Sequence, residues 1–149
     1  MNFQLTDQQL SIQNITRQLA QTELLPTVLK DDEEGNFPEK AYAKMGQMGL
    51  IGLPFPKEYG GQGADYLSYV LAVEEISKVN SSVGIAYSVC TSLFSGGLIN
   101  SASEELKKKY LPDVLSGKRW ALSVLLSRKQ VLTLLDVRQP LSGTAKLMC

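Results

Sequence analysis

Residues 81–100, SSVGIAYSVCTSLFSGGLIN, contain no charged side chain. Apolar or small residues recur there at intervals of three and four, which places them on one face of a helix. These residues are Val83, Ala86, Cys90, Leu93 and Gly97. A second face is small and weakly polar and holds Ser88, Thr91 or Ser92, and Ser95. Because a helix that is apolar nearly all round must be covered on most sides, the segment predicts a central core helix. The same spacing also fits a helix whose small-residue face lines a ligand cavity.

Two amphipathic helices are predicted nearer the N-terminus. Thr6 and Gln9 form a capping box that begins the first, and Pro26 ends or kinks it because proline lacks an amide donor. Its apolar stripe is Leu10, Ile12, Ile15 and Leu19. The acidic run at 31–34 lacks the alternate-residue spacing of a calcium loop and predicts a solvated turn. Pro38 suits the first turn of the second helix. The inward face of that helix holds Ala41, Met45 and Met48.

The stretch 50–63, LIGLPFPKEYGGQG, contains two prolines and four glycines. That composition excludes a long regular element. Its glycine spacing fits neither the dinucleotide-binding fingerprint nor a P-loop, so a phosphate cradle is not indicated. We therefore predict a structural loop that crosses the core.

Two further helices are expected, over residues 66–79 and 104–115. Asp65 is a plausible cap for the first, whose apolar positions include Leu67, Val70, Leu71 and Val73. Its predicted solvent side carries Glu74, Glu75 and Lys78. Adjacent helical residues point about 100° apart, so the two glutamates cannot converge on one bond as a catalytic pair. In the last helix, glutamates four residues before lysines indicate a solvated face. The chain is thus predicted to be all-α, with about six helices.

Composition narrows the function classes. The 149 residues include 15 Lys or Arg and 15 Asp or Glu, so no net charge draws the chain to nucleic acid or an anionic membrane. The absence of histidine removes the commonest general base and metal ligand, and no metal site is predicted. Cys90 and Cys149 make no disulfide framework, which favours a reducing compartment. No signal peptide is recognised at the N-terminus, and no apolar stretch is expected to reach the roughly 18–20 residues of a membrane span. A cytoplasmic location is predicted.

Three segments together resemble a known family. They are LTDQQ near the start, MGLIGLPFPKEYGGQGADYLSYVLAVEEISKVNSSVGI in the middle, and EELKKKYLPDVLSGKRW. This pattern resembles the N-terminal helical domain of the acyl-CoA dehydrogenases, with the short-chain or butyryl-CoA type as the nearest likeness. The resemblance covers residues 1–119, and its most specific part is GLIGLPFPKEYGGQGAD.

The resemblance implies an activity for the complete family enzyme. Such enzymes oxidise an acyl-CoA thioester between its α and β carbons: a carboxylate takes the α proton, and hydride passes to FAD. They assemble as homotetramers. By the same resemblance, the central helix forms one wall of the acyl-chain pocket, and the candidate substrate-binding residues are Tyr87, Cys90, Thr91 and Phe94. No catalytic residue carries over, because the base belongs to a domain beyond the matching segments.

Residues 120–149 depart from the family pattern. The family continues with the flavin-contacting signature G-A-F-G-[LF]-T-E-P-x-A-G-T-D, whereas this chain reads WALSVLLSRKQVLTLLDVRQPLSGTAKLMC. Leu, Ser and Arg, the amino acids with six codons, make up 13 of these 30 residues. Restoring one base ahead of the Trp120 codon permits a translation beginning LGAFGLTEPKAGTD. We therefore predict that the tail is read out of frame and is unstructured or irregular; the alternative is a genuine divergent tail, such as an amphipathic helix.

Two functional interpretations follow. The first is a fragment of an FAD-dependent acyl-CoA dehydrogenase that is inactive alone, binds no FAD and self-associates through uncovered apolar surface. The second is a stand-alone helical module that binds acyl-CoA or a protein without redox chemistry.

Overall fold

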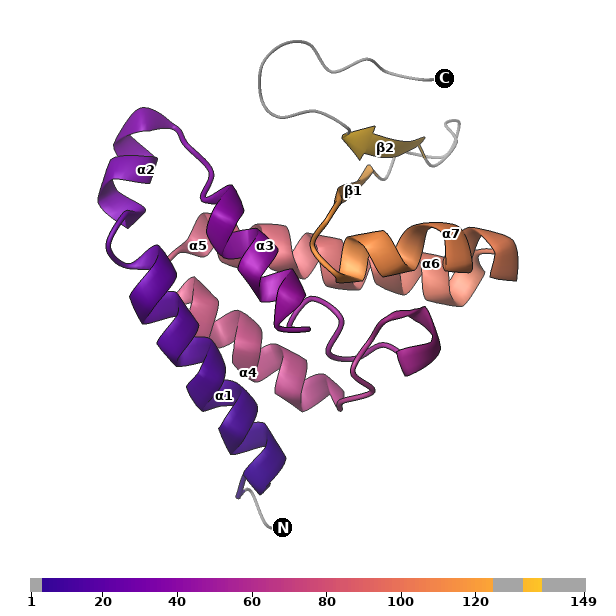
Figure 1. The fold of residues 1–149 in the computed structure, drawn as a ribbon, viewed down its shortest axis with the longest axis horizontal. Helices are drawn as coiled ribbons and strands as arrows, with labels where there is room; N and C mark the ends of the chain where they lie inside the picture. Colours follow the sequence, from indigo (N-terminus) through magenta and orange to yellow (C-terminus); the bar gives the residue numbers. More distant parts are fainter. Residues whose placement is uncertain (1–3, 125–132, 138–149) are drawn as a thin grey trace.

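The computed structural model describes residues 4–124 and 133–137. Helices α1 and α4 lie side by side, and a long helix passes behind α3 with α7 alongside it (Figure 1). The α-helices are α1 (Asp7–Leu19), α2 (Val28–Glu34), α3 (Glu39–Gln47), α4 (Tyr66–Ser77), α5 (Ser81–Ser88), α6 (Gly96–Ser101) and α7 (Glu104–Leu115). A π-helical turn, Val89–Ser95, joins α5 to α6 and completes the predicted central helix. With α5 to α6 counted as one, the described residues hold six α-helices, and the predicted helical fold is confirmed.

The first helix begins and ends where its sequence predicts. The Thr6 hydroxyl accepts from the amide of Gln9 at 3.3 Å, and the Gln9 side chain accepts from the amide of Thr6 at 2.9 Å. A π-helical turn, Ala20–Leu24, extends α1 to two residues before Pro26. The acidic run behaves differently from its prediction, because residues 31–34 form the second half of α2 rather than a turn. Gly35, at φ +66°, ends that helix in the left-handed conformation.

The glycine- and proline-rich segment is the predicted loop through the core. Ile51, Leu53 and Phe55 are buried within it. The loop folds back on itself through backbone hydrogen bonds, including Gly63 N–H to the carbonyl of Phe55 at 2.8 Å. A single 3₁₀ turn, Lys57–Tyr59, stands at its outer end. The loop is therefore ordered by its own backbone and anchored by its apolar side chains.

The face that helix α4 turns to the core matches the prediction only in part: Leu71 is buried and Val73 is partly buried, as expected. Leu67 and Val70, expected inside, are 47% and 52% exposed. Glu75, expected in solvent, is 3% exposed, and its two carboxylate oxygens accept from Arg17 Nε at 2.9 Å and Nη2 at 3.0 Å. The solvent-side prediction for Glu75 was wrong because its partner lies on α1, fifty-eight positions away in the sequence. Local periodicity carries no information about such a partner.

The central helix also buries a face shifted from the predicted one. Val83 and Cys90 are buried as expected, but Leu93 and Gly97 are exposed while Phe94 is buried. A π turn uses i→i+5 hydrogen bonds and so inserts about one extra residue per turn. The buried positions after Val89 therefore move forward by one residue.

This helix meets the length and composition of a membrane span. Ser81–Ser101 has 21 residues, and its most apolar 18-residue window has a mean hydropathy of 1.4, which contradicts our expectation that no stretch reaches that length. Half of its most apolar window is buried inside the described fold. A core helix has the same properties, so the finding is compatible with the packing seen here.

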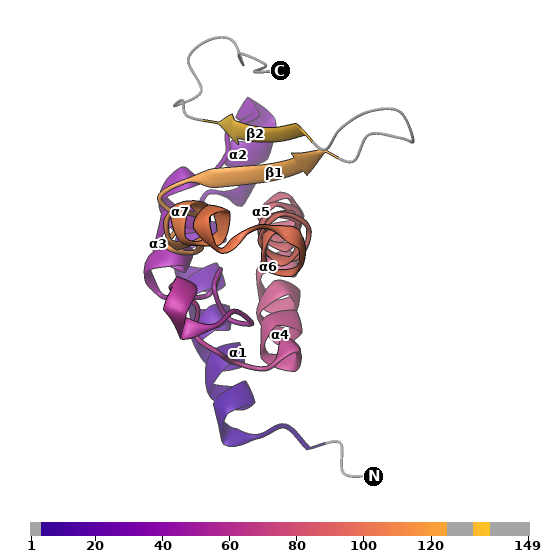
Figure 2. The same ribbon diagram turned by 90° about the vertical axis from the view of Figure 1, so that its right-hand side faces the viewer.

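Two strands follow the helices. β1 (Trp120–Val124) and β2 (Thr133–Val137) pair antiparallel, with Leu122 opposite Leu135, and β1 lies beside the central helix (Figure 2). These two segments form an antiparallel pair of strands, whereas an unstructured or irregular tail was predicted. Their Leu, Val and Thr content suits paired strands. Residues 125–132 and 138–149, on which the rest of that prediction falls, lie outside the described residues.

Candidate functional site

The four predicted pocket residues all lie on the buried face of the central helix. Tyr87, Cys90, Thr91 and Phe94 are exposed by 0, 2, 1 and 6% respectively. The Tyr87 hydroxyl donates to the carbonyl of Leu50 at 2.6 Å, and Thr91 Oγ1 donates to the carbonyl of Ile51 at 3.2 Å. This face therefore fixes the start of the core loop against the central helix.

Tyr87 is fully shielded from solvent where the central helix contacts the core loop. Its ring meets the ring of Tyr69 edge to face, with centroids 5.4 Å apart and planes at 87°. Burial raises the pKa of the Tyr87 hydroxyl well above its usual value, because the phenolate would lose its hydration. The hydroxyl is thus held as a neutral hydrogen-bond donor.

Replacing Tyr87 with phenylalanine is expected to lower the free energy of unfolding by about 1 kcal/mol. The buried carbonyl of Leu50 would lose its shorter hydrogen bond and keep the one from the amide of Leu53, at 3.2 Å. Urea denaturation followed by circular dichroism measures the change. Tyr69→Phe is the matched control, since its hydroxyl reaches Ser88 Oγ only at 3.4 Å. An equal loss in both variants would contradict a specific role for the Tyr87–Leu50 bond.

The opposite face of the central helix is apolar and uncovered. Ile85 and Leu93 are 65% and 46% exposed, and Val89 lies half-buried between them. These three residues, four positions apart, form one stripe, which we call the outer stripe. Sequence reasoning missed it because every face of this helix lacks charge, so periodicity alone could not separate buried from uncovered sides.

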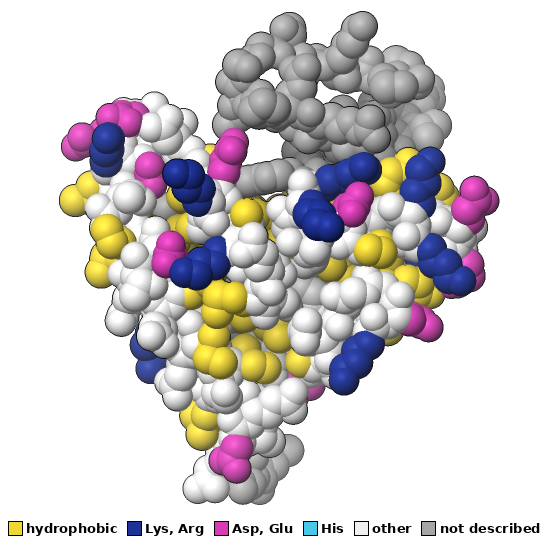
Figure 3. All heavy atoms as spheres, in the orientation of Figure 1, with side chains coloured by type: hydrophobic (Ala, Val, Ile, Leu, Met, Phe, Trp, Pro, Cys, Tyr) yellow, Lys and Arg dark blue, Asp and Glu magenta, His cyan; other side chains and the backbone are white. Residues whose placement is uncertain are grey.

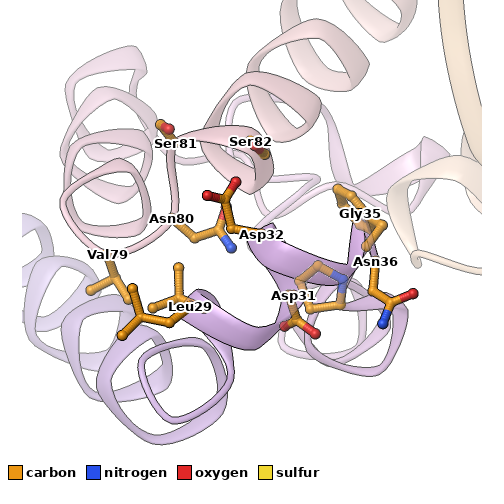
Figure 4. A pocket seen from close by; sticks show the side chains of 12 residues that line it. Leu29, Asp31, Asp32, Gly35, Asn36, Val79, Asn80, Ser81 and Ser82 are labelled. Carbon is orange, nitrogen blue, oxygen red and sulfur yellow. The ribbon is translucent and has the colours of Figure 1, made fainter.

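Two cavities open on the described surface, and neither is lined by the four predicted residues. The first, the α2–α5 cavity, has about 440 Å³ and lies between α2 and the start of α5 (Figure 4). The second has about 380 Å³ and lies where the C-terminal ends of α3 and α7 meet Gly60. The charged residues that line the first cavity are Asp31 and Asp32. The charged residue that lines the second is Lys118.

Neither cavity fits FAD. The carboxylates of Asp31 and Asp32 would repel the pyrophosphate of a dinucleotide in the first. In the second, Lys118 is the one charged lining residue, and the ends of two helices present carbonyl oxygens that disfavour an anion. No cluster of three or more metal-binding side chains occurs in the part of the chain that the structure describes.

Comparison with known proteins covers the helical part of the chain. The sequence model of the family described as "Acyl-CoA dehydrogenase, N-terminal domain" matches residues 6–118. The short-chain specific acyl-CoA dehydrogenase of Clostridium acetobutylicum is 42% identical over 119 residues, which are 80% of this chain and 31% of that protein. The probable acyl-CoA dehydrogenase YngJ of Bacillus subtilis is 41% identical over 117 residues, 78% of this chain and 31% of that protein.

A solved structure agrees with the sequence relatives. Butyryl-CoA dehydrogenase from Megasphaera elsdenii superposes with a TM-score of 0.76 at 32% identity, over 81% of this chain and 33% of that one. The chain therefore spans about a third of the length of the relatives that it matches.

Proposed function

The chain belongs to the acyl-CoA dehydrogenase family, and on that premise we propose that it is the N-terminal helical part of an enzyme that oxidises an acyl-CoA thioester between the α and β carbons. The observation that carries the proposal is the match of the family's N-terminal domain to residues 6–118. The short-chain specific relative at 42% identity supports a short acyl chain as the substrate.

We assign the acyl-facing wall to the outer stripe rather than to the four buried residues. An acyl chain requires apolar surface that the fold itself leaves open, and Ile85 and Leu93 provide it. Tyr87 and Thr91 are occupied by the carbonyls of the core loop. In the complete enzyme, the remaining domains would supply the opposite wall, the flavin and the catalytic base.

On its own the chain is proposed to be inactive. Neither of the two cavities described above fits FAD, and the tail departs from the family's flavin-contacting signature. The uncovered outer stripe and the exposed apolar residues of α4 favour self-association of the isolated chain. Homotetramer formation is proposed only for the whole enzyme.

The test is to incubate the purified chain with FAD, remove free flavin by gel filtration, and add butyryl-CoA with an artificial electron acceptor. We expect a colourless protein and no acyl-CoA-dependent reduction of the acceptor. A yellow protein whose flavin bleaches on addition of butyryl-CoA would overturn the inactive-fragment proposal.

The second candidate is a stand-alone acyl-CoA- or protein-binding module, and the uncovered outer stripe is the observation that favours it. Calorimetric titration separates the two. A module predicts saturable binding of butyryl-CoA that Ile85→Glu abolishes, while Leu106→Glu, a similarly exposed leucine on α7, leaves it intact. An inactive fragment predicts no saturable binding by the parent chain.

A further inference from the structure

The α2–α5 cavity has walls of three different kinds. Val28 and Leu29 of α2 and Val79 form its apolar side. Asp31 and Asp32 bring carboxylates, and Asn80 begins α5 at the other edge. Leu29 is 78% exposed, the highest value among the large apolar side chains described as exposed. An apolar side chain this open, beside a cavity of about 440 Å³, is suited to contact with another molecule.

Asn80 directs an unused donor into this cavity. Its residue is only 8% exposed, its Oδ1 accepts from the amide of Val83 at 3.0 Å, and its backbone N–H and C=O are bonded to Ile76 and Gly84. The side-chain amide group Nδ2 forms no hydrogen bond among the described residues and is accessible to a molecule in the cavity. Asn80 and Asp32 both line this cavity (Figure 4).

The acidic side of the cavity carries uncompensated charge. Across residues 4–124, Asp31, Asp32 and Glu33 form no ion pair, whereas Glu34 is 3.9 Å from Lys30. Acidic side chains gather over α2 at the upper left of Figure 3. A ligand bound here must therefore donate hydrogen bonds to the aspartate carboxylates and accept one from the side-chain amide of Asn80. It must also pack an apolar group on Leu29.

We propose that the α2–α5 cavity docks an extended segment of a partner protein in which an arginine or lysine stands beside an apolar residue. The partner's backbone carbonyl accepts from Asn80 Nδ2, its basic side chain pairs with Asp32 and Asp31, and its apolar side chain covers Leu29. A free anion is excluded by the carboxylates, and a bare metal ion would leave the Asn80 donor unused. The proposal does not depend on the acyl-CoA function.

The test is fluorescence anisotropy with a short labelled peptide that alternates leucine and arginine, and a matched peptide with glutamate in place of arginine. We expect saturable binding of the arginine peptide, with Kd on the order of 100 µM, and none of the glutamate peptide. Asp32→Asn should weaken binding about fivefold and Asn80→Ser about threefold. Serine retains an N-cap oxygen, so α5 should still form.

Glu105→Gln is the matched control, because it removes one exposed carboxylate on α7, away from the cavity. It should leave Kd unchanged. Equal weakening by Glu105→Gln and Asp32→Asn would overturn the proposal in favour of diffuse charge attraction. If calcium ions at stoichiometric concentration displaced the peptide, the proposal of a peptide-docking site would be overturned in favour of a cation site. Absence of saturable binding by the parent chain would also refute it.

Discussion

Replacing Gly61 with alanine is expected to lower the free energy of unfolding by about 3 kcal/mol, the largest effect we predict for one methyl group. A Cβ at Gly61 would collide with the carbonyl carbon and oxygen of Phe55, which are backbone atoms that cannot rotate away. The same carbonyl accepts from Gly63 N–H at 2.8 Å, so moving it would also disturb the loop's own hydrogen bonding. Urea denaturation followed by far-ultraviolet circular dichroism measures the loss.

Gly97→Ala is the matched control for this prediction. Gly97 lies exposed in α6, and a Cβ built there meets no atom within 4 Å. Alanine should therefore stabilise the helix by about 0.5–1 kcal/mol, because it reduces the entropy lost on folding. If Gly61→Ala proved as harmless as Gly97→Ala, the close approach of the loop to itself would be refuted.

Replacing Arg17 with methionine is expected to cost about 2–3 kcal/mol at neutral pH. Methionine keeps the apolar stem but leaves the buried carboxylate of Glu75 with Lys78, at 2.9 Å, as its remaining cation. The value lies below that of a fully buried pair because Arg17 is 44% exposed. Adding Glu75→Leu to Arg17→Met should restore part of the loss, since no unpaired charge then remains.

Lys30→Met is the control for Arg17→Met, because the Lys30–Glu34 pair is exposed on both sides and 3.9 Å apart. It should change the unfolding free energy by less than about 0.5 kcal/mol. If Lys30→Met and Arg17→Met lowered the free energy of unfolding equally, Arg17 would not be the residue that stabilises the buried carboxylate of Glu75.

The same pair predicts a pH dependence. The hydrogen bond from Arg17, assisted by Lys78 and opposed by burial, lowers the pKa of Glu75 from 4.5 to about 2. The folded state therefore holds this proton more weakly than the unfolded chain. Its contribution to stability is complete above the unfolded pKa of 4.5 and is lost as the pH falls toward 2. Glu75→Gln should make stability less dependent on pH over that interval, whereas an unchanged pH profile would contradict the lowered pKa.

Local sequence signals located the elements of this fold well. Thr6 with Gln9, and Asp65 with the amide of Ser68, begin helices as their side-chain chemistry predicts. Pro26 follows the end of the first helical segment, as predicted. These successes share a cause: a cap or a breaker acts on residues within a few positions of itself.

Predictions of which face of a helix is buried failed in two situations. Either a residue pairs with one far away in the sequence, or the helix departs from the regular α-helical period. Glu75 was placed in solvent because Arg17 could not be anticipated from α4 alone. Leu93 was placed inside because a regular period does not allow for the π turn at Val89–Ser95. The same shift brought Phe94 inside and turned Leu93 outward, where it joins Ile85 in the outer stripe that we propose as the acyl wall.

The central claim is that the chain is one part of an acyl-CoA dehydrogenase and that its tail is read out of frame. The most direct test is the nucleotide sequence across codons 115–150 and about 800 bases beyond, a length set by roughly 100–200 residues per further domain. We predict an open frame, displaced by one base from the Trp120 codon, that encodes T-E-P-x-A-G-T-D and continues through the remaining domains. Stop codons in that displaced frame, or no such signature in it, would contradict the account.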